Sequence, residues 1–134
     1  MVSFTVPLLP PSVNHYWKVS MYTGRDGFGH RGRKLTPEAK AWKDAVALCA
    51  RGCTVAPETP SERRKCQYKV VAHVFYGPGD RGDSDNFGKA LLDGLTHAGV
   101  IHSDTHVDFR VVPHKDTRDD PKTPFTVYYV ERLT

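Results

Sequence analysis

A strand pattern followed directly by an amphipathic helix pattern occupies residues 67–99, and this pair of elements most constrains the fold. Residues 67–76 are rich in Val, Tyr and Phe, which favour β-strands, and a Gly-Pro-Gly run ends them. From about Asn86 to Ala98, apolar residues recur at helical spacing, and Gly99 stands where helices commonly end. A helix that packs on a sheet is therefore predicted, with an apolar face of Phe87, Leu91, Leu95 and Ala98.

The remaining patterns predict an α+β fold in which a mixed β-sheet carries two main helices. The other helix begins at Pro37, with Thr36 as its N-cap, and continues to about Gly52. At 134 residues and 39% hydrophobic content, the chain is expected to form one domain, residues 1–134. Further strands are predicted at 3–9, 106–114 and 125–133, with a long glycine-rich loop at 16–34 that contains a short hairpin around 19–22, and a polar connection at 54–66.

Composition excludes several classes of protein. No run approaches the roughly 18 consecutive apolar residues of a membrane span, and the first residues do not resemble a signal peptide. A cytoplasmic location without membrane contact is therefore expected. Three cysteines without Cys-x-x-Cys spacing do not predict a disulfide framework. Cys49 and Cys53 lie one helical turn apart, where two thiolates could face zinc, but two buried small side chains explain the spacing more simply.

Three aspartates lie near the start of the second predicted helix and of the strand that follows it. Asp83 and Asp85 come at the helix start, Lys89 follows one turn later, and Asp104 precedes the strand. A helix running back along a sheet would bring Asp104 toward Asp83. Two or three convergent carboxylates are the usual protein share of a Mg²⁺ site, so the pattern predicts one here. The same aspartates could instead cap the helix and pair with Lys89 on its surface.

Other motifs fit the residues less well. An EF-hand loop that began at Asp83 would place Phe87 and Gly94 where oxygen ligands must stand. The G-x-G-x-x-G run at 27–32 opens no predicted helix, so it does not indicate a dinucleotide site. His102, Asp104 and His106 alternate, and on a strand they would face one way and could hold zinc or manganese. Solvated histidines at a strand edge are the simpler interpretation of that trio.

Positive charge is concentrated in particular segments. The formal net charge is +4 and the pI about 9.0. Arg63, Arg64 and Lys65 form one cluster, and the glycine-rich segment holds another. Localised positive charge is typical of a nucleic-acid binder and would draw DNA toward the carboxylates. The expected DNA-binding residues are Lys18, Arg25, Arg31, Arg33 and Lys34.

Four sequence blocks, at 10–17, 34–39, 83–95 and 99–107, carry a family resemblance that covers nearly the whole chain. The third block has the pattern D-x-D-N-x-x-K-x-x-x-D-x-L, and the fourth supplies a downstream acid, Asp104. Together the blocks resemble the RusA-type Holliday junction resolvases (crossover junction endodeoxyribonucleases). These are small homodimeric endonucleases that cut four-way DNA junctions.

The resemblance implies that Asp83, Asp85 and Asp104 ligate Mg²⁺, with Mn²⁺ as an alternative metal, and that Lys89 is the essential lysine of the site. The family commonly has two adjacent acids where this chain has Ser103-Asp104. Because Asp104 matches the second acid, the number of ligands is kept and only a fourth carboxylate is missing. Asn14 and Asn86 are expected to support the site by hydrogen bonding.

The implied activity is Mg²⁺-dependent hydrolysis of DNA phosphodiesters, in paired incisions at a Holliday junction, during DNA recombination or repair. A two-fold homodimer would present two sites to the pseudo-symmetric junction. Two other interpretations stay open. One is a non-catalytic DNA-junction-binding module in which the acids only cap a helix. The other is a zinc hydrolase built on His102, Asp104 and His106.

Overall fold

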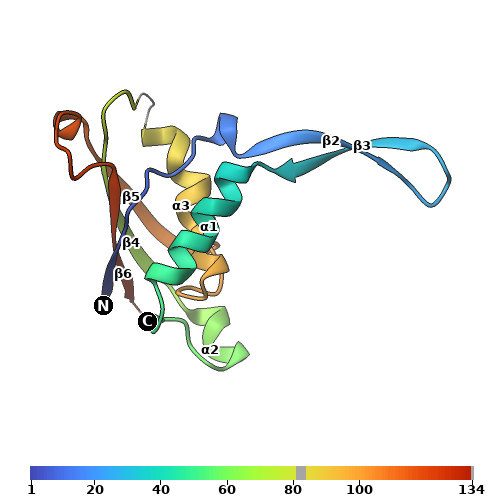
Figure 1. Cartoon of the computed structure of the whole chain (residues 1–134). Coiled ribbons are helices and arrows are strands. Elements are labelled where there is room, and N and C mark those ends of the chain that lie inside the picture. The colour runs from blue at the N-terminus through green and yellow to red at the C-terminus, as the bar shows by residue number, and fades with distance from the viewer. Residues whose placement is uncertain (81–83, 134) are drawn as a thin grey trace.

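A four-stranded mixed β-sheet forms one layer of the protein in the computed structural model, which describes residues 1–80 and 84–133, with residues 84 and 85 as backbone only (Figure 1). The strand order is β1–β6–β4–β5. β4 pairs in parallel with β5 and antiparallel with β6, which in turn pairs antiparallel with β1. The predicted α+β fold with a mixed sheet is thereby confirmed. The strands are β1 (Val2–Val6), β4 (Tyr68–Phe75), β5 (Val107–His114) and β6 (Phe125–Arg132).

The two longest helices form a second layer on one face of this sheet (Figure 1). They are α1 (Pro37–Cys49) and α3 (Gly88–His97), which contact each other along their lengths. None of the helices in the described part of the chain is long and apolar enough to cross a membrane. The shorter elements are α2 (Pro60–Lys65) and the 3₁₀ segments η1 (Val13–His15), η2 (Ser84–Phe87) and η3 (Lys115–Thr117).

Helix α1 begins where the sequence predicts. The Thr36 hydroxyl accepts a hydrogen bond from the Ala39 N–H at 3.2 Å, and Pro37 follows at the first helical position, where no N–H is needed. The same hydroxyl donates to the His15 carbonyl at 2.5 Å. The N-cap therefore also fixes the end of η1 against the start of α1.

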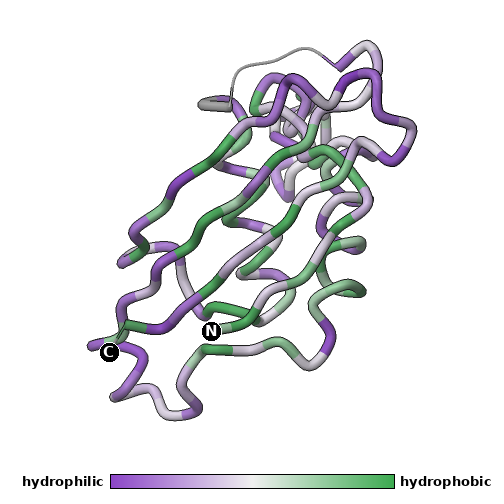
Figure 2. The backbone as a smooth tube through the Cα atoms, turned by 90° about the vertical axis from the view of Figure 1, so that its left-hand side faces the viewer, coloured by the Kyte–Doolittle hydropathy of each residue, from purple (hydrophilic) through white to green (hydrophobic). Residues whose placement is uncertain are grey.

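The sheet buries one face and leaves the other open. Alternate β4 residues, from Tyr68 to Val74, are fully buried beneath the helices, whereas the intervening residues are exposed or half-buried. Figure 2 views the sheet from the side that carries no helix, and hydrophilic and hydrophobic positions alternate along its strands. This period of two is the pattern of a sheet with one covered face.

Two buried side chains tie α3 to its neighbours. The Trp42 Nε1–H of α1 donates to the Ala90 carbonyl at 2.8 Å, and the Tyr128 hydroxyl of β6 donates to the Leu91 carbonyl at 2.8 Å. The helices approach closely at Gly94, where a Cβ atom would lie 3.0 Å from Trp42 Nε1 and from Val46 Cγ2. A side chain at this position would meet two buried neighbours, which explains the glycine.

A long hairpin projects away from this two-layer core (Figure 1). It consists of β2 (Trp17–Thr23) and β3 (Gly29–Leu35), which form a separate antiparallel two-stranded sheet. We call residues 17–35 the arm. The sequence predicted a long loop with only a short hairpin around 19–22, and that was wrong in extent. Glycines and charged residues in the second strand lower its β-propensity, so the strand exists through pairing with β2.

Other boundaries also differ from expectation. The first strand ends at Val6 rather than near residue 9, and the segment predicted as a connection at 54–66 contains α2. The start of α2 repeats the signal of α1, because the Thr59 hydroxyl caps the Glu62 N–H at 3.4 Å and Pro60 follows it. Strand β5 begins at Val107, one residue after the predicted start, and the residues at 102–106 before it contain bends and a turn.

Replacement of Tyr128 by Phe removes only the hydroxyl that holds α3. We expect Tyr128→Phe to lower the free energy of unfolding by about 1 kcal/mol, the usual net value of one buried hydrogen bond, with an unchanged urea m-value. Tyr129→Phe is the matched control, since Tyr129 lies on the open face and is 40% exposed. Equal stability decreases in the two variants would show that the bond to Leu91 contributes nothing.

Candidate functional site

The start of α3 carries the described part of the candidate site. Lys89 is exposed, and its Nζ lies 3.4 Å from Asp93 Oδ2, one turn further along the helix. The sequence expected Lys89 to share a face with Asp85, whose side chain lies outside the described residues. Because the pair is partly exposed, it adds little stability, and its main effect is to set the direction of the Lys89 side chain.

Asp93 has a second partner that comes from the other end of the sequence. The Tyr16 hydroxyl donates a hydrogen bond to Asp93 Oδ2 at 2.7 Å. Tyr16 is fully buried, and its ring lies edge-on to Trp17, with 5.2 Å between ring centroids. Burial, with the hydrogen bond and charge of Asp93, raises the pKa of the Tyr16 hydroxyl well above its ordinary range. The phenol therefore stays protonated and serves as a fixed donor to the carboxylate.

Sequence reasoning assigned no role to Tyr16 or Asp93, although both fall inside the blocks that carry the family resemblance. The spacing of Lys89 and Asp93, four residues apart on a predicted helix, was a signal that could have linked them. No sequence rule could have paired Tyr16 with Asp93, because 77 residues separate them. This contact exists because η1 lies against the start of α3 and against η2.

Asn14 and Asn86, which the sequence analysis expects to support the site, lie in η1 and η2. Asn14 is in η1 and exposed, and Asn86 is in η2 and half-buried. Neither side chain makes a hydrogen bond to another residue within 1–80 or 84–133. Their support of the site therefore stays a prediction.

The described residues do not test whether the three predicted metal ligands meet. Asp83 lies outside them, and so does the side chain of Asp85, although its backbone belongs to η2. Asp104 is exposed in the turn before β5. Within residues 1–80 and 84–133, no three His, Cys, Asp or Glu side chains are grouped to hold a metal.

The strand topology places the segments that carry Asp83 and Asp104 relative to the ends of β4 and β5. Because β4 and β5 are parallel, the amino end of each lies at the same edge, and Tyr68 pairs with Val107 there. The chain leaves β4 at the opposite edge, enters η2, and returns through α3 to Asp104. The start of α3 nevertheless lies over β5, since a Cβ atom on Gly88 would be 3.6 Å from the Phe109 ring. The expectation that the returning helix brings Asp104 to Asp83 thus stays a prediction.

The structure does not support the alternative zinc site. His102, Asp104 and His106 lie in turns, so they do not share one face of a strand as the alternation had suggested. His102 Nδ1 is instead hydrogen-bonded to the Tyr68 hydroxyl at 2.5 Å. All three residues belong to the described part of the chain, and the structure does not bring them together as a metal-binding group.

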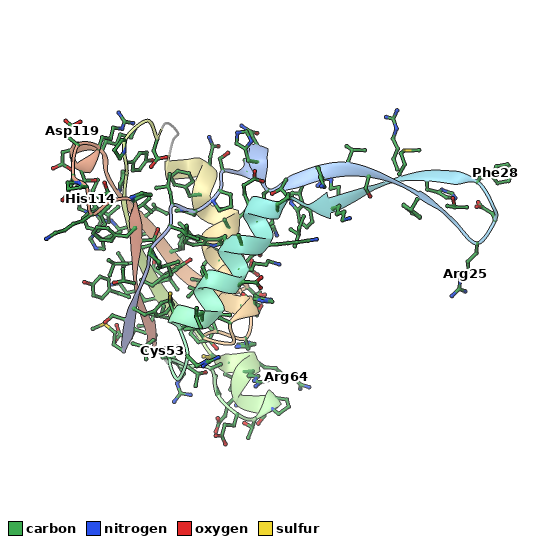
Figure 3. All side chains as sticks on the ribbon, in the orientation of Figure 1. Arg25, Phe28, Cys53, Arg64, His114 and Asp119 are labelled. Atoms are coloured by element: carbon green, nitrogen blue, oxygen red, sulfur yellow. The ribbon has the colours of Figure 1, made fainter. Side chains whose placement is uncertain are left out.

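The arm carries the excess positive charge of the protein. It contains five lysines and arginines and one aspartate, whereas the rest of the chain contains fourteen basic and fourteen acidic residues. Every one of the basic side chains on the arm is exposed. The predicted DNA-binding residues, Lys18, Arg25, Arg31, Arg33 and Lys34, are thus brought together on one projecting two-stranded ribbon (Figure 3).

The strand register divides the arm into two faces. Val19 pairs with Arg33 and Met21 with Arg31, so one face sets a row of apolar side chains beside a row of arginines. On the other face, Lys18 pairs with Lys34. Val19 is 70% exposed and Met21 67% exposed. A surface that combines exposed cations with exposed apolar groups suits a polyanion that also presents flat apolar rings.

Comparison with known proteins assigns no family. No protein-family model matches the chain, and no curated protein sequence matches it. Interpretation of the site therefore depends on the geometry above and on the sequence blocks themselves.

The Tyr16 hydroxyl gives a test of the contact to Asp93. Its pKa in the folded protein is raised above the ordinary value of 10.0, so unfolding above pH 10 releases a proton that the folded state retains. This contribution is fully present below pH 10 and disappears as the pH rises beyond it. Between pH 10 and 11, the stability of the wild type should fall more steeply than that of Tyr16→Phe, by at most about 1.4 kcal/mol per pH unit.

Urea unfolding at each pH measures both slopes. Tyr22→Phe on the arm is the control, because it removes a phenol hydroxyl from a side chain that is 55% exposed. Parallel slopes for wild type and Tyr16→Phe would contradict the burial of the Tyr16 hydroxyl together with its hydrogen bond to Asp93.

Proposed function

We propose that this protein is a Mg²⁺-dependent, structure-selective DNA endonuclease of the RusA type, which resolves Holliday junctions in recombination or repair. The observation that carries the proposal is the concentration of the whole excess charge on an exposed arm, in a chain whose D-x-D-N block leads into the helix that presents Lys89. The first feature fits a polyanionic substrate, and the second fits hydrolysis of its phosphodiesters.

The arm supplies the DNA contacts in this proposal. Lys and Arg side chains on a two-stranded ribbon can follow a phosphate backbone and fix the position of the duplex without reading its bases. The rest of the chain is balanced in charge, so the arm determines where DNA is drawn. Structure selection then depends on the shape of the substrate rather than on its sequence.

The donor set fits Mg²⁺. Asp83, Asp85 and Asp104 offer carboxylate oxygens, the ligands that this ion prefers. Asp104 is exposed and makes no hydrogen bond or ion pair with a residue in the described ranges, so its carboxylate is available. Asp93 is engaged by Tyr16 and Lys89, so it is not among the proposed ligands. When bound, Mg²⁺ lowers the pKa of a water molecule and offsets charge on the phosphate.

Lys89 acts on the phosphate directly in this scheme. Its ammonium is a compact cation at the start of α3, and it can approach the oxygen on which negative charge develops during hydrolysis. The Asp93 carboxylate, held in turn by the Tyr16 hydroxyl, keeps Lys89 directed along the helix surface. Lys89 is the proposed catalytic residue of this group, and Tyr16 and Asp93 are positioning residues.

A homodimer completes the proposal. A four-way junction has approximate two-fold symmetry, and its resolution requires two incisions at related positions. Two copies of the chain related by a two-fold axis present two equivalent sites to those positions.

The rival function is a DNA-junction-binding module without catalysis. The arm by itself supports this function, because phosphate contacts require none of the aspartates.

Neutral replacement of the proposed metal ligands separates the two functions. We expect Asp83→Asn and Asp104→Asn to abolish cleavage of a synthetic four-way junction in Mg²⁺, with binding in EDTA nearly unchanged. Asp108→Asn is the control, since Asp108 is exposed on nearby β5 and has no proposed role. Cleavage by both ligand variants would refute the metal site, and a wild type that binds but cuts in no divalent metal would favour the binding module.

The contribution of the arm is tested by salt dependence. The double variant Arg31→Gln/Arg33→Gln should bind DNA more weakly, and the slope of log K against log salt should shrink by about 0.9 for each phosphate that the arm no longer neutralises. Arg51→Gln/Arg64→Gln removes the same charge from exposed positions outside the arm and should change the slope little. Equal changes in both double variants would indicate that net charge, rather than the arm, attracts the DNA.

A further inference from the structure

We infer that Phe28, at the tip of the arm, stacks on an unstacked base of branched DNA, so that the arm recognises a branch point as well as the duplex. This inference rests on the proposed function and names what the end of the arm contacts. It follows from the way the tip is built, from the exposure of Phe28, and from the charge around it.

The tip of the arm is a turn held by backbone hydrogen bonds. The Gly24 N–H donates to the Phe28 carbonyl at 2.9 Å, and the Gly27 N–H donates to the Gly24 carbonyl at 3.0 Å. Gly27 has a φ of +81°, a conformation that favours glycine. These bonds fix the backbone on which Phe28 is carried.

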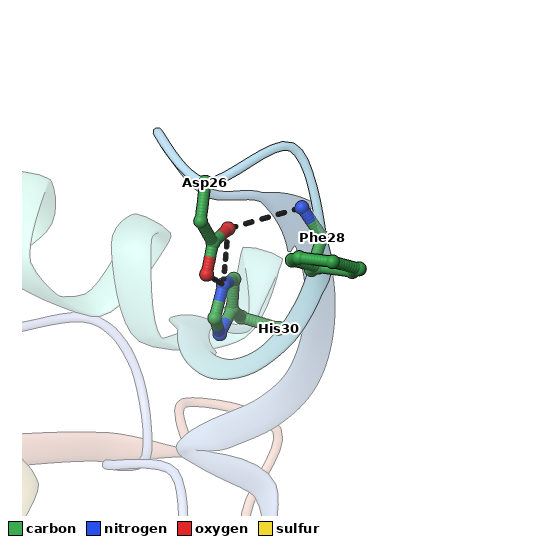
Figure 4. Close-up of polar contacts among 3 residues, drawn as sticks. All are labelled: Asp26, Phe28 and His30. Atoms are coloured by element: carbon green, nitrogen blue, oxygen red, sulfur yellow. Dashed lines mark hydrogen bonds and ion pairs between the residues drawn. The ribbon is translucent and has the colours of Figure 1, made fainter.

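A network of side chains holds the backbone N–H of Phe28. Asp26 Oδ1 accepts the Phe28 N–H at 3.0 Å, and the Asp26 carboxylate also lies 3.0 Å from His30 Nε2 (Figure 4). The His30 ring stacks on Tyr22, with 5.5 Å between centroids, which ties the network to the opposite strand. Both the N–H and the carbonyl of Phe28 are therefore engaged, and its backbone is preorganised.

The Phe28 side chain itself is left without a partner in the described chain. It is 72% exposed and makes no ring contact with any residue in 1–80 or 84–133. Figures 3 and 4 show the ring pointing outward from the tip, away from the two-layer core. A single exposed aromatic residue is common on protein surfaces, but a rigid backbone that presents one at the end of a projecting ribbon is not explained by stability. The geometry suits contact with something outside the molecule.

The surrounding charge indicates what that partner is. Arg25 is exposed three residues before Phe28 and also points away from the tip (Figure 3). Figure 3 shows the Arg25 and Phe28 side chains on different sides of the same tip. An exposed cation and an exposed aromatic ring at one tip fit a nucleic-acid strand, because a phosphate can face the guanidinium while a base along the strand stacks on the ring. In a continuous duplex the base faces are covered by their neighbours. At a branch point the stacking is interrupted, and apolar wedges can enter there.

Binding measurements in EDTA test this without any cleavage. Base stacking on an aromatic side chain is worth about 1–3 kcal/mol, so Phe28→Ala should weaken binding to a four-way junction about 5- to 150-fold. Binding to a linear duplex of equal length should stay within about 2-fold, since phosphate contacts are unchanged. Phe28→Trp should retain junction affinity, because indole stacks as well as a phenyl ring.

Two further variants sharpen the result. Leu48→Ala removes a comparably exposed apolar side chain from α1, outside the arm, and should not change the preference for junctions. Arg25→Gln should weaken binding to both DNAs and reduce the salt slope, which distinguishes a phosphate contact from stacking.

The possible failures are distinct. If wild type prefers junctions and Phe28→Ala keeps that preference in full, the inference is overturned and the proposed endonuclease stands. If the wild type binds no DNA, both are overturned. If Phe28→Ala changes the protein from dimer to monomer in sedimentation and lowers affinity for both DNAs alike, Phe28 is a protein–protein contact and the inference is again overturned.

Discussion

The fixed position of α3 is the constraint on which the candidate site depends. Two buried donors, the Trp42 indole and the Tyr128 hydroxyl, bind the consecutive carbonyls of Ala90 and Leu91. They come from different elements, one from the other helix and one from the sheet, so together they restrict rotation of α3 about its axis. Since a buried donor without its partner costs about 1–3 kcal/mol, such rotation is strongly opposed. The direction of Lys89, one residue before these carbonyls, follows from this restraint.

The side chains that stabilise the fold and those that carry the net charge lie in different parts of the molecule. The core elements bury most of the large aromatic and aliphatic side chains, while the arm, which projects away from that core, holds the net positive charge (Figure 1). Concentrating like charges in a compact core would oppose folding, because their repulsion acts at short range. On a projecting two-stranded ribbon the same charges are solvated and screened. Binding of a polyanion can thus be strong without a cost to the core.

The sequence predicted those elements whose signals are local. Thr36 and Pro37 mark the start of α1, and the apolar stripe ending at Gly99 marks α3, because caps and helical periodicity act within one or two turns. The arm was underestimated because β3 contains glycines and charges and is stabilised by its partner strand. The alternation of His102, Asp104 and His106 left a shared strand face open as an alternative, because alternation alone does not distinguish a strand from the turns found there. Tyr16 and Asp93 could not be paired, since only the packing of η1 on α3 brings them together.

Asp93 and Asp104 differ in their hydrogen-bond and ion-pair partners, and this difference indicates different roles. Asp93 is held by one buried donor and one lysine, so its charge is balanced within the chain and it serves to orient Lys89. Asp104 is exposed, and none of the residues in the described ranges balances its charge. A carboxylate whose neighbours leave it unpaired is stabilised by any cation that bridges it to a bound phosphate. Metal affinity at such a site should therefore rise when DNA is bound, since the phosphate supplies ligands that the protein lacks.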